Sequence, residues 1–199
     1  MYTTHFGFEN GPFKPKDLDG FYRHASFDGA CADILDGIRE RRGFILLTGE
    51  VGLGKTLTLH RCMTEADDIR FVLLTNAGFD FPDILNYLCA SLGLPVESLD
   101  TGQQSQLLLD TLATNARRNQ ITALLIDDAH LLRISVLRQL LDFVETPPIP
   151  GQRLQVVLAG LPEIEGKLRQ PELGRLQDSV RTRCRLERLS RLETALFIT

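Results

Sequence analysis

The sequence lacks any long apolar run. No stretch approaches the roughly 20 consecutive apolar residues that a helix needs to cross a bilayer. Residues 1–5 also lack the basic region followed by an apolar stretch that marks an export signal. We therefore expect a cytoplasmic protein, and attachment to the inner face of the cytoplasmic membrane stays open.

Cysteine is scarce as well. Cys31, Cys62, Cys89 and Cys184 fall at irregular spacing, and no two of them form a C-x-x-C pair. This spacing argues against a zinc site and against the disulfide framework of a secreted domain. We expect reduced thiols that mostly fill the core.

Lysine is equally rare. The four lysines are Lys14, Lys16, Lys55 and Lys167, and none of them lies in an N-K-x-D segment. A GTPase would carry such a segment to read the guanine base, so the sequence argues against guanine specificity. One of these lysines, Lys55, closes the most informative segment of the chain.

Residues 49–56 read Gly-Glu-Val-Gly-Leu-Gly-Lys-Thr, which is a complete G-x-x-x-x-G-K-[ST] P-loop. An apolar run precedes the loop and a helical pattern begins near Lys55, so backbone N–H groups and a helix N-terminus converge where a triphosphate fits. Lys55 is expected to reach the β- and γ-phosphates, and the Thr56 hydroxyl to ligate magnesium. The predicted nucleotide-binding residues are Gly49, Glu50, Val51, Gly52, Leu53, Gly54, Lys55, Thr56 and Leu57.

A second apolar strand, 123–126, ends in two carboxylates, Asp127 and Asp128, in a Walker B pattern. Ligands bind at this carboxyl edge in open α/β sheets. We predict that Asp127 acts on Mg²⁺ through a water molecule. Asp128 stands where a hydrolytic enzyme of this class carries a glutamate, so it is the candidate catalytic base, one methylene shorter. Alternatively, Asp128 caps a helix that starts near His130.

Strand and helix patterns alternate along the chain, which predicts one α/β domain with a parallel sheet and helices on both faces. With 199 residues and 43% hydrophobic content, such a domain can bury a sizeable core without disulfides. The predicted strands are 43–48, 71–75, 122–127, 154–159 and 184–187. The predicted helices are 27–40, 55–65, 81–92, 103–118, 132–145 and 162–180.

The net charge of −4 is unevenly distributed. Residues 167–191 hold eight basic and three acidic side chains, which makes this stretch +5 and the remainder −9. Three uses of the stretch stay open. It can grip the phosphates of duplex DNA, it can serve a neighbouring subunit's nucleotide, or it is a solvated surface.

Several segments together resemble the AAA+ ATPases of the ExeA/GspA (general secretion) type, which are related to TniB/TnsC/MuB transposition ATPases and to Orc-type AAA+ proteins. These segments are Phe6-Gly7-Phe8, Pro12-Phe13, Gly37-Ile38, Arg42–Phe44, the P-loop with its Gly49–Gly52 start, and Leu158–Ile164. The resemblance implies a P-loop NTPase (AAA+/ASCE) fold of five parallel strands in the order 5-1-4-3-2. It also implies ATP and Mg²⁺ as cofactors, and a homo-oligomer whose site is completed where subunits meet.

The same resemblance implies an arginine finger just before the fifth strand. Arg183 is the first choice, because Thr182-Arg183-Cys184 is similar to the Ser-Arg-Cys of clamp-loader ATPases, and Arg181 is the second. A finger from the next subunit would stabilise charge on the γ-phosphate and make hydrolysis depend on assembly. The alternative for Arg183 is a surface salt bridge. Phe13, Phe21 and Tyr22 lie where this class packs its adenine, although they can equally be core residues.

Two departures from the family pattern bear on mechanism. Leu161 follows the fourth predicted strand, near the sensor-1 position that normally carries a polar side chain. The chain also ends soon after Leu189–Leu196, which resembles the opening of a helical lid. The expected organisation is therefore an N-terminal segment 1–26, an AAA+ core 27–189, and a truncated lid start 190–199.

Three functions follow from these features. The first is an ATPase that works, slowly or only on assembly, as an oligomeric switch for a secretion or cell-envelope partner. The second is a DNA-associated ATPase that regulates transposition or target selection, which the acidic net charge disfavours. The third is a nucleotide-binding interaction module without turnover. A small-molecule kinase is a further alternative that rests on the P-loop alone.

Overall fold

The computed structural model describes residues 25–147 and 153–188. Its centre is a five-stranded sheet with the strand order β2-β3-β4-β1-β5, and every pairing is parallel. Read from the other edge, this is the predicted order 5-1-4-3-2, which is confirmed. The strands are β1 Phe44–Thr48, β2 Ile69–Leu74, β3 Ile121–Ile126, β4 Gln155–Gly160 and β5 Val180–Arg185.

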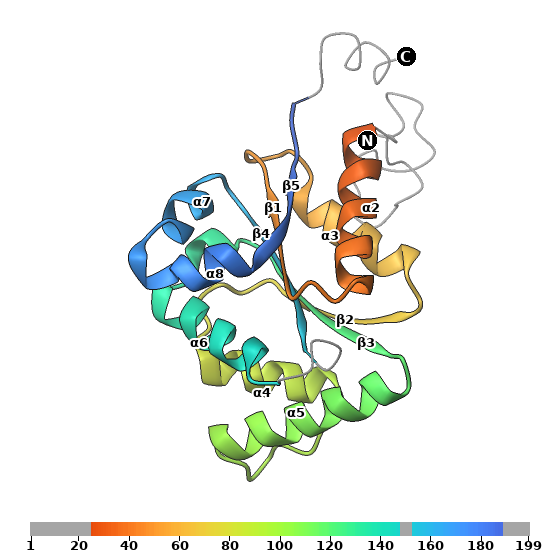
Figure 1. Cartoon of the computed structure of the whole chain (residues 1–199), viewed down its shortest axis with the longest axis vertical. Coiled ribbons are helices and arrows are strands. Elements are labelled where there is room, and N and C mark those ends of the chain that lie inside the picture. Colours follow the sequence, from red (N-terminus) through yellow and green to blue (C-terminus); the bar gives the residue numbers. More distant parts are fainter. Residues whose placement is uncertain (1–24, 148–152, 189–199) are drawn as a thin grey trace, which may run out of the picture.

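Helices cover both faces of the sheet, as predicted (Figure 1). One face is covered by α2 Ala25–Arg39 and α3 Lys55–Glu65, and the other by the remaining helices. The remaining helices are α4 Phe81–Ser91, α5 Thr101–Arg117, α6 Ile134–Glu145, α7 Glu163–Leu168 and α8 Gly174–Ser179, with 3-10 turns η2 Ala129–Leu131 and η4 Pro171–Leu173.

The alternation of side chains along β1 divides the core between these two faces. Phe44 and Leu46 belong to the apolar cluster under α4–α8, whereas Ile45 and Leu47 belong to the cluster under α2 and α3. Every residue of β1 is buried, because β1 lies between β4 and β5 with helices on both sides. A strand buried in this way fixes the start of the loop that follows it.

Two helices begin with a reciprocal capping box. Asp80 accepts from the Asp83 backbone N–H at the start of α4, and the Asp83 side chain accepts from the Asp80 N–H in return. Asp100 and Gln103 make the same exchange at the start of α5. The caps satisfy backbone donors that would otherwise be unpaired at each helix start.

The predicted helix 162–180 is wrong, because the structure breaks it into α7, η4 and α8. Pro171 begins η4 and has no N–H to continue a helical ladder.

The fifth strand begins at Val180, whereas 184–187 was predicted. Its alternation of buried Val180, Thr182 and Cys184 with exposed arginines is typical of an edge strand, and the charges obscured it.

All four cysteines are buried and free, in agreement with the prediction that they fill the core. Among residues 25–147 and 153–188, no helix combines the length and the apolar content needed to cross a membrane. The predicted segments 1–26 and 190–199, together with Phe13, Phe21 and Tyr22, lie almost entirely outside the described residues.

Candidate nucleotide-binding site

The P-loop connects β1 to α3 and takes its shape from two glycines. Gly52 and Gly54 have φ angles of 80° and 84°, a left-handed conformation that residues with a Cβ rarely adopt. At Gly54 a Cβ would also lie 2.7 Å from the Phe27 ring. Gly54 is the N-cap of α3 and offers no side chain to the first N–H groups of that helix. Those donors are free to face an anion, as is typical of phosphate sites at helix N-termini.

Lys55 supplies the positive charge of the loop. Its side chain is buried, and Nζ donates to the backbone oxygens of Gly49 and Glu50 at 2.9 Å each. These two bonds hold the ammonium group over the concave side of the loop. Phosphate oxygens could take over this charge-assisted hydrogen bonding, because a lysine ammonium has three donors.

Thr56 and Asp127 bring the two sequence motifs into direct contact. The Thr56 hydroxyl donates to Oδ2 of Asp127 at 2.5 Å, from the first turn of α3 to the carboxyl end of β3. Asp127 is buried, and its Oδ1 accepts from the backbone N–H of Asp128 at 3.0 Å. A hydroxyl and a carboxylate are the oxygen donors that Mg²⁺ accepts beside nucleotide phosphates, so these residues fit that ion.

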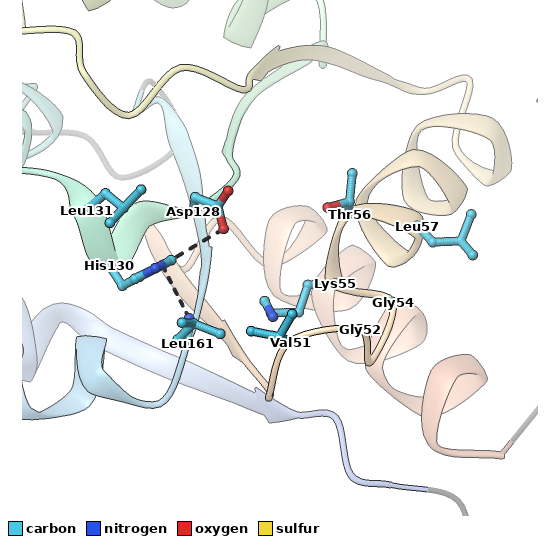
Figure 2. Close-up of a pocket in the computed structure, with 10 residues that line it drawn as sticks. All are labelled: Val51, Gly52, Gly54, Lys55, Thr56, Leu57, Asp128, His130, Leu131 and Leu161. Carbon is cyan, nitrogen blue, oxygen red and sulfur yellow. Dashed lines mark hydrogen bonds and ion pairs between the residues drawn. The ribbon is translucent and has the colours of Figure 1, made fainter. Parts of the chain in front are cut away.

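Asp128 adopts an unusual backbone conformation. Its φ and ψ are 50° and 34°, and its side chain is 54% exposed. It occupies the N-cap position of η2, as the alternative predicted, but its carboxylate makes no capping hydrogen bond there. Residues other than glycine in this left-handed region concentrate at functional sites. The turn instead lets the carboxylate face the space in front of the P-loop (Figure 2).

These elements surround a pocket of about 500 Å³ (Figure 2). The P-loop and α3 form one wall, and the turn after β3 and the end of β4 form the other. Val51 and Leu131 lie at the two walls with 82% and 61% of their surface exposed. The lining residues are Val51, Gly52, Gly54, Lys55, Thr56, Leu57, Asp128, His130, Leu131 and Leu161.

Comparison with known proteins identifies the family. A family model described as an AAA domain matches residues 38–168. The chain belongs to the AAA family. General secretion pathway protein A of Aeromonas hydrophila is 33% identical over 206 residues, which cover 100% of this chain and 37% of that protein. The resemblance of this AAA chain to ATPases of the ExeA/GspA type is therefore confirmed, and the chain spans little more than a third of that relative.

Solved structures share the fold of this AAA domain. Cdc6p from Pyrobaculum aerophilum superimposes with a TM-score of 0.69 at 20% identity, over 94% of this chain and 52% of that chain. The Aeropyrum pernix ORC2 protein in its ADP form gives a TM-score of 0.70 at 15% identity, over 94% and 54%. At these identities the likeness concerns the fold alone.

The AAA domain brings most of the predicted site residues together. Six of the predicted nucleotide-binding residues line the main pocket. Asp127 accepts a hydrogen bond from one of them, Thr56. Gly49, Glu50 and Leu53 line an adjacent pocket of about 230 Å³. The end of β5 and the residues after it form the other side of this second pocket, where Arg188 lies 3.7 Å from the Glu50 carboxylate.

Arg183 lies apart from these residues. It was predicted just before the fifth strand, but it lies within β5, paired in register with Leu46. Its guanidinium is exposed and donates to the Gln177 backbone oxygen at 3.3 Å. Among the described residues it is part of neither pocket wall near the P-loop. A role as an arginine finger for another copy stays a prediction.

Two residues of the AAA site were missed from the sequence. His130 lines the main pocket, with Nδ1 3.9 Å from Oδ1 of Asp128. Lys167 donates from Nζ to the backbone oxygens of His130 and Leu132, and burial lowers the pKa of this lysine below its ordinary value. The position of His130, two residues after the paired carboxylates, was the available signal. Nothing local in the sequence connects Lys167 to the turn after β3.

Proposed function

We propose that this chain binds Mg·ATP between the P-loop and the end of β3, and hydrolyses it slowly or only on assembly. The observation that carries the proposal is the 2.5 Å contact between Thr56 and Asp127, beside the buried ammonium of Lys55. The contact brings a hydroxyl, a carboxylate and a lysine to one sheet edge, and these are the groups that a metal-bound triphosphate requires.

Each residue has a distinct part in this mechanism. Lys55 and the N-terminus of α3 hold the phosphates, and the Asp128 carboxylate takes a proton from the attacking water. Thr56 and, through a water molecule, Asp127 would hold Mg²⁺, which neutralises charge on the phosphates when it is bound. All of these groups lie on the walls of one pocket or contact a residue that does.

Slow turnover follows from the reach of Asp128. Its side chain is one methylene shorter than the glutamate that serves as base in hydrolytic members of the class. A displacement of about 1 Å at a reacting group can lower the rate roughly 100-fold. Leu161 lines the same pocket and brings no polar group to the water. Binding of the nucleotide does not depend on either feature.

Dependence on assembly is supported by the open side of the pocket. The apolar side chains of Val51 and Leu131 are largely exposed at its walls, where a neighbouring copy could cover them. Such a copy could bring Arg183 to the γ-phosphate. An arginine supplied in this way raises turnover by roughly 10³–10⁵-fold in other P-loop NTPases.

A secretion or cell-envelope partner is the proposed recipient of this switch. The general secretion relative supports this choice, although the chain aligns with only 37% of it. We place the switch in the cytoplasm, at the inner face of the membrane or free of it. The partner itself would be recognised by surfaces that respond to the nucleotide.

A DNA-associated ATPase is the second candidate, and the edge strand β5 favours it. Arg183 and Arg185 alternate with the buried Thr182 and Cys184, so their side chains share one exposed face, and Arg181 is exposed just before them. Adjacent arginines on such a face suit a row of phosphates. Binding to duplex DNA that weakens steeply between 50 and 200 mM salt would support this candidate, and its absence at low salt would remove it.

Phosphate release measured against protein concentration tests the first candidate. We expect the rate per molecule of wild-type protein to rise with concentration, because the active site is completed between copies. Lys55→Ala should lose ATP binding by at least tenfold, and Arg183→Ala should keep binding but lose the rise. A constant rate per molecule would argue against a shared site. Tight ATP binding without any phosphate release would leave the binding module as the function.

A further inference from the structure

The end of β4 presents an apolar side chain to the phosphate side of the pocket. Leu161 follows Gly160, the last residue of β4, and both walls of the pocket converge beside it (Figure 2). Water that attacks a phosphate needs polar groups to orient it. Leu161 offers none from its side chain, so another element must supply the missing polar group.

His130 lies in the space next to Leu161. Its side chain is only 14% exposed and points from η2 towards the region between Asp128 and Leu161 (Figure 2). The backbone N–H of Leu161 donates to Nδ1 of His130 at 3.4 Å. The same nitrogen lies 3.9 Å from Oδ1 of Asp128, the predicted base. The ring therefore stands between the base and the end of β4.

The hydrogen bond from Leu161 also fixes the tautomer of the neutral ring. Because Nδ1 accepts this bond, the ring proton lies on Nε2. A neutral histidine has one donor and one acceptor, so Nε2–H is the donor that remains. It belongs to a side chain that lines the pocket, where a water or a phosphate oxygen can accept from it.

Two further contacts hold His130 in this place. A Cβ on residue 160 would come within 3.1 Å of the His130 backbone nitrogen and 3.3 Å of Nδ1, so Gly160 allows the close approach. From the other side, Lys167 of α7 donates to the backbone oxygens of His130 and of Leu132, the latter at 2.7 Å. The ring is thus anchored by β4 and its backbone by α7.

We propose that His130 is a positioning residue for hydrolysis, in the place where β4 provides only Leu161. Together with Asp128 it orients the attacking water, to which His130 contributes the Nε2–H donor. Asp128 takes the proton of that water, whose oxygen bonds to the terminal phosphorus while the bond to the ADP oxygen breaks. The ring proton stays on Nε2. This inference rests on the proposed ATPase function and names a residue that the proposed function does not need for binding.

Three substitutions of His130 separate positioning from packing. His130→Ala removes both ring nitrogens, and we expect kcat to fall at least tenfold while KM and the Kd for a fluorescent ATP analogue change less than twofold. His130→Asn keeps an acceptor near the position of Nδ1 but has no donor near Nε2, so kcat should stay low. His130→Gln brings an amide donor closer to the position of Nε2 and should recover part of kcat.

The matched control is His60→Ala, because His60 is an exposed histidine on α3. This variant should keep the kcat, KM and Kd of the wild-type protein. Melting temperatures show which His130 variants are folded. If His130→Ala is unfolded, the comparison of kcat between His130→Asn and His130→Gln still separates positioning from packing.

Two results would overturn the inference and leave the ATPase function standing. The first is a kcat for His130→Ala within twofold of wild type. The second is equal recovery by Asn and Gln, which would mean that His130 acts only by packing. Wild-type protein that binds Mg·ATP but releases no phosphate at any concentration would remove the hydrolytic function, and this inference with it.

Discussion

Asp128 has two properties that oppose each other in catalysis. Its left-handed backbone turns the carboxylate into the pocket, and aspartate tolerates this conformation better than most residues do. The same side chain is too short to reach as far as a glutamate. The residue that suits the turn is thus not the residue that suits the reaction, and we therefore expect the proposed ATPase to turn over slowly.

Replacing Asp128 by glutamate should give a base with a longer reach at the cost of a less favourable backbone conformation. We expect kcat for ATP to rise by about tenfold or more, because the longer side chain brings the base nearer the water. The free energy of unfolding should fall by about 1 kcal/mol, because glutamate is less favourable at positive φ. Steady-state phosphate release and denaturant unfolding measure the two effects.

Asp67→Glu is the matched control for this exchange, since Asp67 is exposed and outside the pocket. It should change neither quantity. If Asp128→Glu left kcat unchanged in a folded protein, the length of the side chain would not be what limits turnover.

Among the helices, α3 carries Lys55 and Thr56, and it is joined to α2 by apolar packing and by the ion pairs of one arginine. Arg61 of α3 is 15% exposed; its Nε donates to Glu65 at 2.6 Å, and Nη1 pairs with Asp28 of α2. Its hydrogen bond lowers the pKa of the Glu65 carboxyl below the ordinary value of 4.5. The ion pairs help to set the position of Lys55 and Thr56 at the start of the same helix.

Arg61→Met should reduce the free energy of unfolding at pH 7 by about 1 kcal/mol or less, because both carboxylate partners are partly exposed to solvent. A lowered pKa in the folded state means that this stabilisation is present above pH 4.5 and is lost as the pH falls through the folded value. The difference between wild type and Arg61→Met should therefore shrink below pH 4.5.

Denaturant titrations at several pH values measure this difference. Arg138→Met, at an exposed arginine of α6, is the control and should leave stability within about 0.5 kcal/mol at every pH. If the difference in unfolding free energy between wild type and Arg61→Met persisted below pH 4.5, the packing of the arginine stem, not its charge, would account for the stabilisation.

Some elements could be predicted from the sequence and others could not, for physical reasons. β1 and β3 are buried on both faces, so their continuous apolar runs were sufficient. β5 is an edge strand whose alternate residues are arginines, and its pattern was hidden directly after the short helix α8. The turn around His130 depends on Leu161 and Lys167, which lie more than 30 residues away in the chain, so local pattern could not reveal it.

At the scale of the whole molecule, the parallel sheet is what makes the site. Its topology places β1 and β3 on either side of β4, so the P-loop and the paired carboxylates emerge at the same edge (Figure 1). The family resemblance predicted the strand order, whereas the P-loop and the Walker B pattern predicted that Thr56 and Asp127 lie at one site. The basic strand β5 borders the sheet at the other side of β1, where another molecule can approach it.

The dependence of ATP affinity on magnesium tests whether the P-loop, Thr56 and Asp127 form one site for Mg·ATP. Isothermal titration with ATP should give a Kd at least tenfold lower in Mg²⁺ than in EDTA for wild-type protein, because Thr56 adds a ligand to the phosphate-bound ion and Asp127 holds a water molecule of that ion. Thr56→Val and Asp127→Asn should each lose most of this difference and remain folded. Equal affinities with and without Mg²⁺ in the wild type, or an undiminished magnesium effect in both variants, would mean that Thr56 and Asp127 do not form a magnesium site.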